Sequence, residues 1–480
     1  MIKHTLIYLV AFAAPGALGF LSFSAYTRFL SPSEYAIYSV GASVAFLIGN
    51  VCFGWVRFSI GRFQAESPES NFVPFALTCL AVTAVIVGPP IGYGVFRFNS
   101  VPPIVVGGIL SMTVGQALFD ITQEVRRARR QSVAFTRISV VRSLIGVILS
   151  VGVAYAFHSG AAVLFSIATG FALMGVAFIV ENRASLYWGD VWKAQAQRFF
   201  YYGMPLALSG LVFSGNSTLA RIIVVNALGA AAAGQYGAAL DLTGQLTMMI
   251  ASSVCSIMGP AAIRAYGTNG APAARKELAT GLELFLGILA PMVVGLAISA
   301  PAFAAVVSGH AFEGAVGQLI PLLVFSRALN VFSQFYLHLG FQIVEKPLRQ
   351  VVCGGATLAL NFALSYALTK PFGLTGAAVA LLVADLGGVL VSFVLLVPVF
   401  PMPFPLSKVA RVAVATACMA VACQGVVSVV SASPNVTLAA TVATGVAVYA
   451  GLVWAFDIAS VRALVYKGGH LSFLTHLRRA

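Results

Sequence analysis

The sequence contains very little charge. Of its 480 residues only 9% are Asp, Glu, Lys or Arg, and 59% are hydrophobic, whereas about a quarter of an ordinary soluble domain is charged. This composition excludes a water-soluble globular protein. Cysteine is scarce as well: there are six, all within apolar segments and without the spacing of a metal or redox site. We therefore expect no metal and no other cofactor.

Long apolar segments are abundant. A helix needs about 20 mostly apolar residues to cross a bilayer, because its backbone polar groups must be satisfied internally. We expect an all-α integral membrane protein with about fourteen transmembrane helices. The predicted spans are 6–26, 36–56, 73–95, 104–122, 138–157, 161–180, 202–225, 236–258, 282–300, 319–341, 351–368, 374–397, 409–429 and 438–456.

The basic residues predict an orientation for these spans. Lys and Arg accumulate on the cytoplasmic side of short loops. With the N-terminus inside, most of the 28 basic residues fall on that side, including Arg142 and the run Arg126 to Arg130. Both termini are therefore expected in the cytoplasm. A basic cytoplasmic rim accounts for the net charge of +14, so no nucleic-acid partner is expected.

The chain shows a weak internal repeat. Leu30 and Tyr38 follow the first span with the same spacing as Leu228 and Tyr236 after the seventh. Both segments follow outward-going helices, so the halves would be parallel repeats. The predicted organisation is an N-terminal lobe of six spans at 1–180, a cytoplasmic link at 181–201, a second lobe of six spans at 202–397, and two further spans with a tail at 398–480.

Six degenerate motifs occur in one order along most of the chain. They resemble those of the polysaccharide (O-antigen) flippase family, which belongs to the multidrug/oligosaccharidyl-lipid/polysaccharide exporter superfamily. The motifs are Arg28-Phe-Leu-Ser-Pro-Ser-Glu-Tyr-Ala-Ile-Tyr38, Gly54-Trp-Val-Arg-Phe-Ser-Ile-Gly-Arg62, Tyr202-Gly-Met-Pro205, residues 229–242, Pro260-Ala-Ala-Ile-Arg-Ala-Tyr266 and Phe372-Gly-Leu-Thr-Gly-Ala-Ala378.

The resemblance implies two six-helix lobes around a central cavity, two additional C-terminal helices, and alternating access. It also implies a cargo of oligosaccharide carried on undecaprenyl diphosphate, with membrane lipids and a polysaccharide polymerase or export complex as further partners. Similar proteins often carry an acidic residue before the arginine of span seven. This chain has Ala220 before Arg221, which puts ion coupling at that position in doubt.

Charged residues inside spans are costly and mark candidate functional sites. Arg221 and Asp241 lie at similar depths on adjacent spans and form either a structural ion pair or a gate or ion-coupling site. Asp385 lies at a depth comparable with Arg327, and is either its counter-ion or a protonation site that couples transport to a proton gradient.

Span ten carries a polar face. Arg327, Asn330, Gln334 and His338 are spaced by three, four and four residues, which places them on one side of a regular helix. Such a face suits a path for phosphates and sugar hydroxyls. It would equally suit hydrogen bonds between helices.

Two arginines in the N-terminal lobe are further candidates. Arg28 lies near the outer end of span one and Arg57 at the inner end of span two. Either they snorkel to the interface, or they capture a diphosphate, for which the guanidinium fork is well suited.

Two other classes of function compete with the flippase. An ion-coupled multidrug antiporter or a peptidoglycan-precursor flippase of the same superfamily is one alternative, although drug antiporters usually have twelve spans and an acidic residue in span one, and this chain has no Asp or Glu before Glu34. A membrane-bound polysaccharide polymerase or ligase is the other. The external loops are short and carry no nucleophile motif or phosphate-binding glycine loop, so we expect no enzyme activity.

Overall fold

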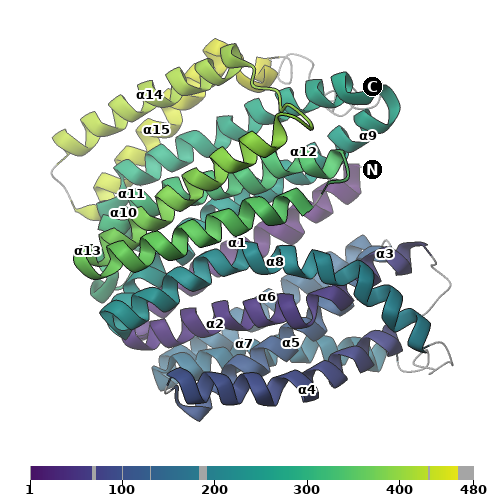
Figure 1. Ribbon diagram of the computed structural model, residues 1–480. Helices are drawn as coiled ribbons and strands as arrows, with labels where there is room; N and C mark the ends of the chain where they lie inside the picture. The colour runs from purple at the N-terminus through teal and green to yellow at the C-terminus, as the bar shows by residue number, and fades with distance from the viewer. Residues whose placement is uncertain are drawn as a thin grey trace. The chain divides into compact units, whose positions relative to one another are not determined.

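The computed structural model describes residues 2–66, 72–99, 101–129, 131–182, 192–346, 348–430 and 433–462. Within these ranges the secondary structure is helical, with no strand (Figure 1). The helices are α1 (Ile2–Phe29), α2 (Pro32–Cys52), α3 (Gly54–Glu66), α4 (Val73–Asn99), α5 (Pro103–Ala128), α6 (Ser132–Phe157), α7 (Gly160–Glu181), α8 (Trp192–Leu228), α9 (Ala230–Ile298), α10 (Ala300–Val307), α11 (His310–Phe332), η2 (Ser333–Leu337), α12 (His338–Ile343), α13 (Leu348–Leu396), α14 (Leu406–Val429), α15 (Pro434–Phe456) and η3 (Ile458–Ser460).

Many of the helices are long enough to cross a membrane. In the described part of the chain, ten have the length and apolar composition for it, or eleven if the bent α8 is counted as one span. The protein is thus a multi-pass helical membrane protein, as the sequence predicts.

Two of the longest helices are broken at glycine. The 69 residues of α9 would extend about 100 Å at 1.5 Å per residue, against a hydrocarbon core of about 30 Å. Gly270 interrupts α9 with φ of 73°, and Gly373 interrupts α13 with φ of 62°. Glycine adopts this left-handed conformation without the steric cost that a Cβ adds. Each break therefore allows one continuous helical segment to change direction.

The start of α2 explains why the first family motif has its composition. Ser31 caps the helix, since its hydroxyl accepts from the Glu34 backbone N–H at 3.3 Å, and Pro32 occupies the first turn. The Glu34 carboxylate accepts in turn from the backbone N–H of Gly160, at the start of α7, at 2.7 Å. The motif thus fixes the beginning of one helix and ties it to another.

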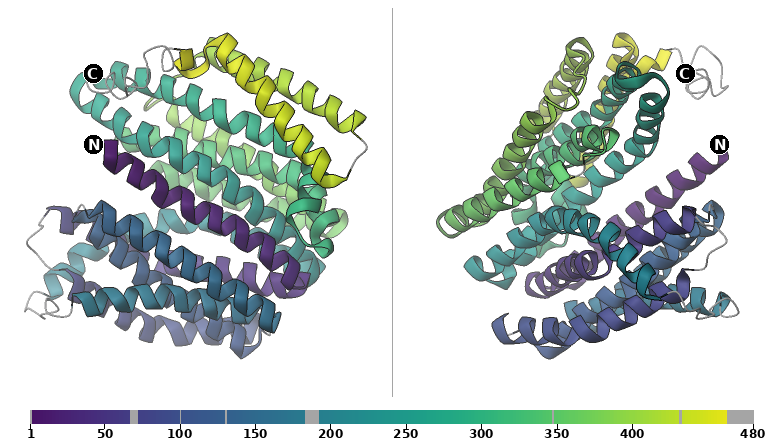
Figure 2. Two further views of the ribbon diagram at one scale, coloured as in Figure 1. Left: turned by 180° about the vertical axis from the view of Figure 1, so that it is seen from behind. Right: turned by 45° about the vertical axis from the view of Figure 1, so that its right-hand side comes forward.

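Contacts between residues divide the chain into two compact units. The first comprises 1–241 and 365–377, and the second comprises 242–364 and 378–480. In the first unit α7 packs against α5 and α6, and α8 packs along α2 and α3. In the second unit α14 and α15 lie side by side, and α10 contacts α11 and α15 (Figure 2). The expected lobe boundary at 181–201 stays a prediction.

Candidate functional site

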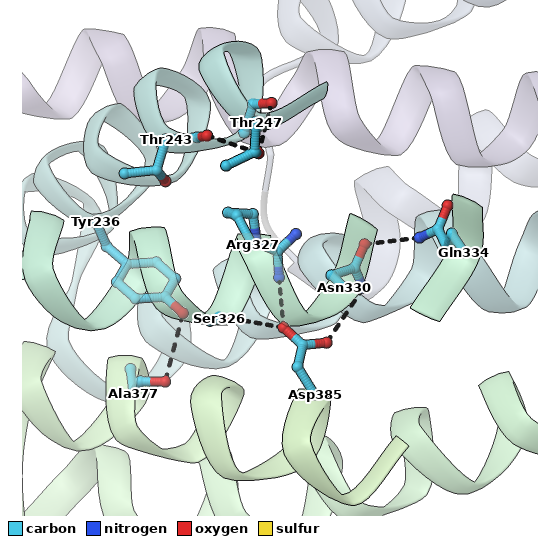
Figure 3. Close-up of polar contacts among 10 residues, drawn as sticks. Tyr236, Thr243, Thr247, Ser326, Arg327, Asn330, Gln334, Ala377 and Asp385 are labelled. Carbon is cyan, nitrogen blue, oxygen red and sulfur yellow. Dashed lines mark hydrogen bonds and ion pairs between the residues drawn. The ribbon is translucent and has the colours of Figure 1, made fainter. Parts of the chain in front are cut away.

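Among the residues that the structure describes, the most deeply buried ion pair lies in the second unit, between α11 and α13 (Figure 3). Asp385 on α13 is 2% exposed, and its Oδ2 accepts from the Ser326 hydroxyl at 2.5 Å and from Arg327 Nη2 at 3.1 Å. Asn330 donates to Oδ1 at 3.2 Å. A carboxylate removed from water needs such partners, because an unpaired buried charge costs several kcal/mol. Asp385 is thus the counter-ion of Arg327 in this structure.

The polar face predicted on span ten is continuous only in part. Gln334 donates to Asn330 Oδ1 at 2.7 Å, which extends the Asp385 cluster along the helix. The π-helical segment η2 then changes the helical register. His338 lies beyond it, 3% exposed, and hydrogen-bonds to the hydroxyls of Ser392 at 3.2 Å and Ser333 at 3.3 Å. The structure therefore places His338 in a different polar contact from Arg327.

A second charged cluster lies in the first unit. Arg221 on α8 forms an ion pair with Asp241 on α9, and its Nη1 donates to the backbone carbonyl of Ser39 at 3.0 Å. The Tyr35 hydroxyl donates to Asp241 Oδ2 at 2.9 Å. Tyr35 and Ser39 are both on α2, and each is 1% exposed. The pair thus fastens α2 to α8 and to the start of α9.

Removing the Tyr35 hydroxyl is expected to weaken this fastening. The Tyr35→Phe variant keeps the ring but loses the hydrogen bond to an ionised carboxylate, which is worth about 1.5–3 kcal/mol. We expect a lower thermal unfolding midpoint for the purified protein in detergent. Tyr155→Phe is the control, because the Tyr155 side chain is 66% exposed. Equal midpoints for the two variants would contradict the role given to this hydrogen bond.

Arg57 lies in the first turn of α3, immediately after the break that separates α3 from α2. Its Nη1 is 3.2 Å from Asp120 Oδ2 on α5, and the two side chains are 26% and 28% exposed. Its guanidinium also lies 4.7 Å from the centre of the Phe58 ring. Arg28 is separate: it is exposed, and it donates to the Ser24 backbone carbonyl at 3.4 Å and contacts the Ser24 hydroxyl.

Several polar residues of these clusters are not among the candidate site residues predicted from the sequence. Asp120 is the only acidic residue within the predicted span 104–122. A charged residue inside a span is costly, so its position alone could have marked it as a candidate site residue. Arg142, expected on the cytoplasmic side, lies more than two turns into α6 with its guanidinium against the rings of Phe119 and Phe171; its side of the membrane stays a prediction. Tyr35 is uncharged, so the search for charged residues within spans does not identify it as a candidate.

A large apolar groove opens in the second unit. It has a volume of about 550 Å³ and is lined by residues of α9 from both sides of its Gly270 break, and by α10, α14 and α15. Tyr449 on α15 donates to the Gly287 carbonyl of α9 at 2.7 Å, and Lys408 on α14 pairs with Glu283 of α9 at 2.8 Å. These contacts hold α14 and α15 beside α9. The apolar side chains that line the groove include Leu246, Ile288, Pro291, Met292, Leu296, Phe303, Met419, Leu438, Val442 and Val446.

Metal-ligating side chains do not gather anywhere in the described ranges. No group of three or more His, Cys, Asp or Glu residues there could hold a metal ion. All six cysteines are free. The candidate site consists instead of arginine–aspartate pairs with amide and hydroxyl neighbours, which can bind anions and exchange hydrogen-bond partners.

These features define a class: a helical membrane protein with buried ion pairs and an apolar groove. Residues 26–317 match the sequence model of a family described as polysaccharide biosynthesis proteins. The chain belongs to this family, which confirms the resemblance seen in the motifs. Among curated proteins, no sequence match is found.

Solved structures show the same fold. The lipid II flippase MurJ in its inward closed conformation aligns with a TM-score of 0.75 and 13% identity, covering 96% of this chain and 99% of that one. An inward-facing multidrug resistance MATE family transporter of the MOP superfamily aligns with a TM-score of 0.54 and 16% identity, covering 86% and 95%. A MOP superfamily transporter from Pyrococcus furiosus aligns at 0.56 with 14% identity over the same shares. The fold is that of MOP-superfamily flippases and transporters.

Proposed function

We propose that the protein is a flippase. It moves undecaprenyl-diphosphate-linked oligosaccharide repeat units across the bacterial inner membrane by alternating access, and so serves the biosynthesis of a surface polysaccharide. The family match to polysaccharide biosynthesis proteins and the MOP-superfamily fold both agree with this role. A polymerase or export complex would receive the flipped units.

The apolar groove carries the proposal. A polyprenyl chain is a long hydrocarbon that must stay out of water while its headgroup crosses the membrane, and each buried CH₂ group contributes about 0.8 kcal/mol. The groove offers a continuous apolar surface of this kind. The arginines of the buried pairs suit the diphosphate, and the amides of Asn330 and Gln334 suit sugar hydroxyls.

The topology proposed for this flippase has fourteen spans, with both termini in the cytoplasm. Helices α9 and α13 count once each among the ten apolar helices, and their breaks at Gly270 and Gly373 would divide each into two spans. The bent α8 and the 28-residue α1 supply the remaining two. The basic residues of the intervening loops support this orientation.

The proposed activity can be measured in liposomes. Purified protein is reconstituted with fluorescent undecaprenyl-diphosphate oligosaccharide, and an external quencher reports which leaflet holds the label. We expect the protein to accelerate exchange between the leaflets above the rate in protein-free liposomes. Unchanged exchange with folded protein, under every imposed ion gradient and with several glycans, would refute the proposal.

A second candidate is a flippase for a peptidoglycan precursor. The observation that favours it is the TM-score of 0.75 with the lipid II flippase MurJ. Both cargoes join a polyprenyl tail to a glycan through a diphosphate, so the groove and the arginines serve either. The same liposome assay with labelled lipid II distinguishes them, because the proposed flippase is expected to move the oligosaccharide cargo faster.

A further inference from the structure

The turn that follows α15 has a strained backbone. In the described part of the chain five non-glycine residues have a positive φ, and three of them lie in this turn: Asp457 at 49°, Ala459 at 56° and Ser460 at 57°. A Cβ makes this left-handed conformation costly, and it persists only where the surrounding structure imposes it. The neighbours of the turn must therefore hold it in place.

One carboxylate of α9 makes such a contact. Glu283 is 4% exposed, and its Oε1 accepts from the backbone N–H of Ala459 at 3.1 Å. Its Oε2 pairs with Lys408, in the first turn of α14, at 2.8 Å. The Lys408 side chain is 34% exposed, so its ammonium group can reach water without this partner. Glu283 thus joins α9 both to the start of α14 and to the turn after α15.

The turn places an apolar side chain beside the same part of α9. Ile458 is 2% exposed, clusters with Val412 and Ala415 of α14, and has Leu286 of α9 packed against it. The apolar groove begins at this level, since Gly287, one turn along α9 from Glu283, is part of its lining. The contacts made by Glu283 and by the turn therefore lie at one end of the groove.

We propose that Glu283 is a positioning residue for the apolar groove. It holds the turn in its strained conformation, and the turn holds the ends of α14 and α15 against α9, so that the groove keeps the width that a polyprenyl tail fills. Without this carboxylate Ala459 leaves the left-handed conformation, and α14 and α15 separate from α9. A groove that is formed for only part of the time binds more weakly in proportion. This inference rests on the proposed function, whose cargo carries the tail.

The first test is amide hydrogen exchange of the full-length protein in detergent, followed by mass spectrometry of peptides that contain the turn. We expect Glu283→Ala to exchange about tenfold faster there, because the Ala459 N–H loses its acceptor and the turn opens. Glu283→Gln loses the charge that pairs with Lys408 but keeps an oxygen for Ala459, so its exchange should lie within about twofold of wild type. An ion pair that only stabilised the fold would give the same result in both variants.

The matched control removes a carboxylate elsewhere in the second unit. Glu313 pairs with His310 within α11, at 2.6 Å, and is not part of the groove. We expect the turn of Glu313→Ala to exchange within about twofold of wild type, because distant substitutions act independently.

The second test is the binding of undecaprenyl phosphate, which carries the tail without a glycan, measured by native mass spectrometry. If the groove of Glu283→Ala is formed for about a tenth of the time, its affinity falls about tenfold. Adding Ala459→Gly should restore most of this loss, because glycine adopts the left-handed conformation without the cost of a Cβ. Glu283→Gln should bind within about twofold of wild type.

Ala459→Gly alone decides the matter if Glu283→Ala does not fold. We expect its turn to exchange no faster than that of wild type, and its affinity for undecaprenyl phosphate to be kept. Faster exchange or weaker binding in this variant, equal behaviour of Glu283→Gln and Glu283→Ala, failure of the rescue, or no binding by wild type would overturn the proposal. Neither test requires transport, so a protein that does not flip oligosaccharide in liposomes can still give the expected results.

Discussion

Replacing Val446 by lysine is expected to slow flipping of the lipid-linked oligosaccharide about a hundredfold. Val446 lies on α15, is 64% exposed and lines the apolar groove. A lysine at the centre of a membrane helix costs about 2.5–3.5 kcal/mol on insertion scales. If the polyprenyl tail contacts this position, the same cost lowers the protein's affinity for the lipid-linked oligosaccharide about a hundredfold.

The control for this variant carries the same lysine outside the groove. Val421 on α14 is 75% exposed and does not line the groove, so Val421→Lys has a comparable insertion cost without meeting the tail. We expect it to flip at close to the wild-type rate in the liposome assay. Equal flipping rates for the two lysine variants would contradict the hypothesis that the polyprenyl tail binds in this groove.

Local features of this fold could be predicted from the sequence alone. Each span depends on the hydropathy of its own residues, so the helical class follows from composition. The partnership of Arg327 with Asp385 was one of two alternatives, since similar depth on different spans brings opposite charges within reach. A charged residue inside an apolar segment predicts a partner, because an unpaired charge there costs several kcal/mol of free energy.

Features that depend on the packing of distant segments could not be predicted. The π-helical turn Ser333–Leu337 alters the regular periodicity on which the face from Arg327 to His338 was based. The pairing of Asp120 with Arg57 joins residues far apart in sequence. The groove is equally hidden, because every span is apolar and only the placement of α14 and α15 beside α9 decides which apolar residues remain uncovered.

The Asp385→Ala variant is expected to be the most destabilised of the single substitutions. It leaves the Arg327 side chain, 11% exposed, without its carboxylate partner. Breaking a buried ion pair from one side costs about 3–5 kcal/mol, because the remaining charge stays buried without compensation. Ser326 and Asn330 lose their acceptor at the same time. The measurement is thermal unfolding in detergent, followed by the loss of helical circular dichroism.

A double variant separates stability from transport. In Asp385→Leu with Arg327→Met, both charges are replaced by apolar side chains of similar volume, which is often neutral for stability. We expect its unfolding midpoint to recover most of what Asp385→Ala loses. If Arg327 serves the cargo, the double variant will be stable and yet fail to flip lipid-linked oligosaccharide; if the pair serves only the fold, flipping will return with stability. A double variant as unstable as Asp385→Ala would show instead that the polar network contributes through geometry that apolar side chains cannot replace.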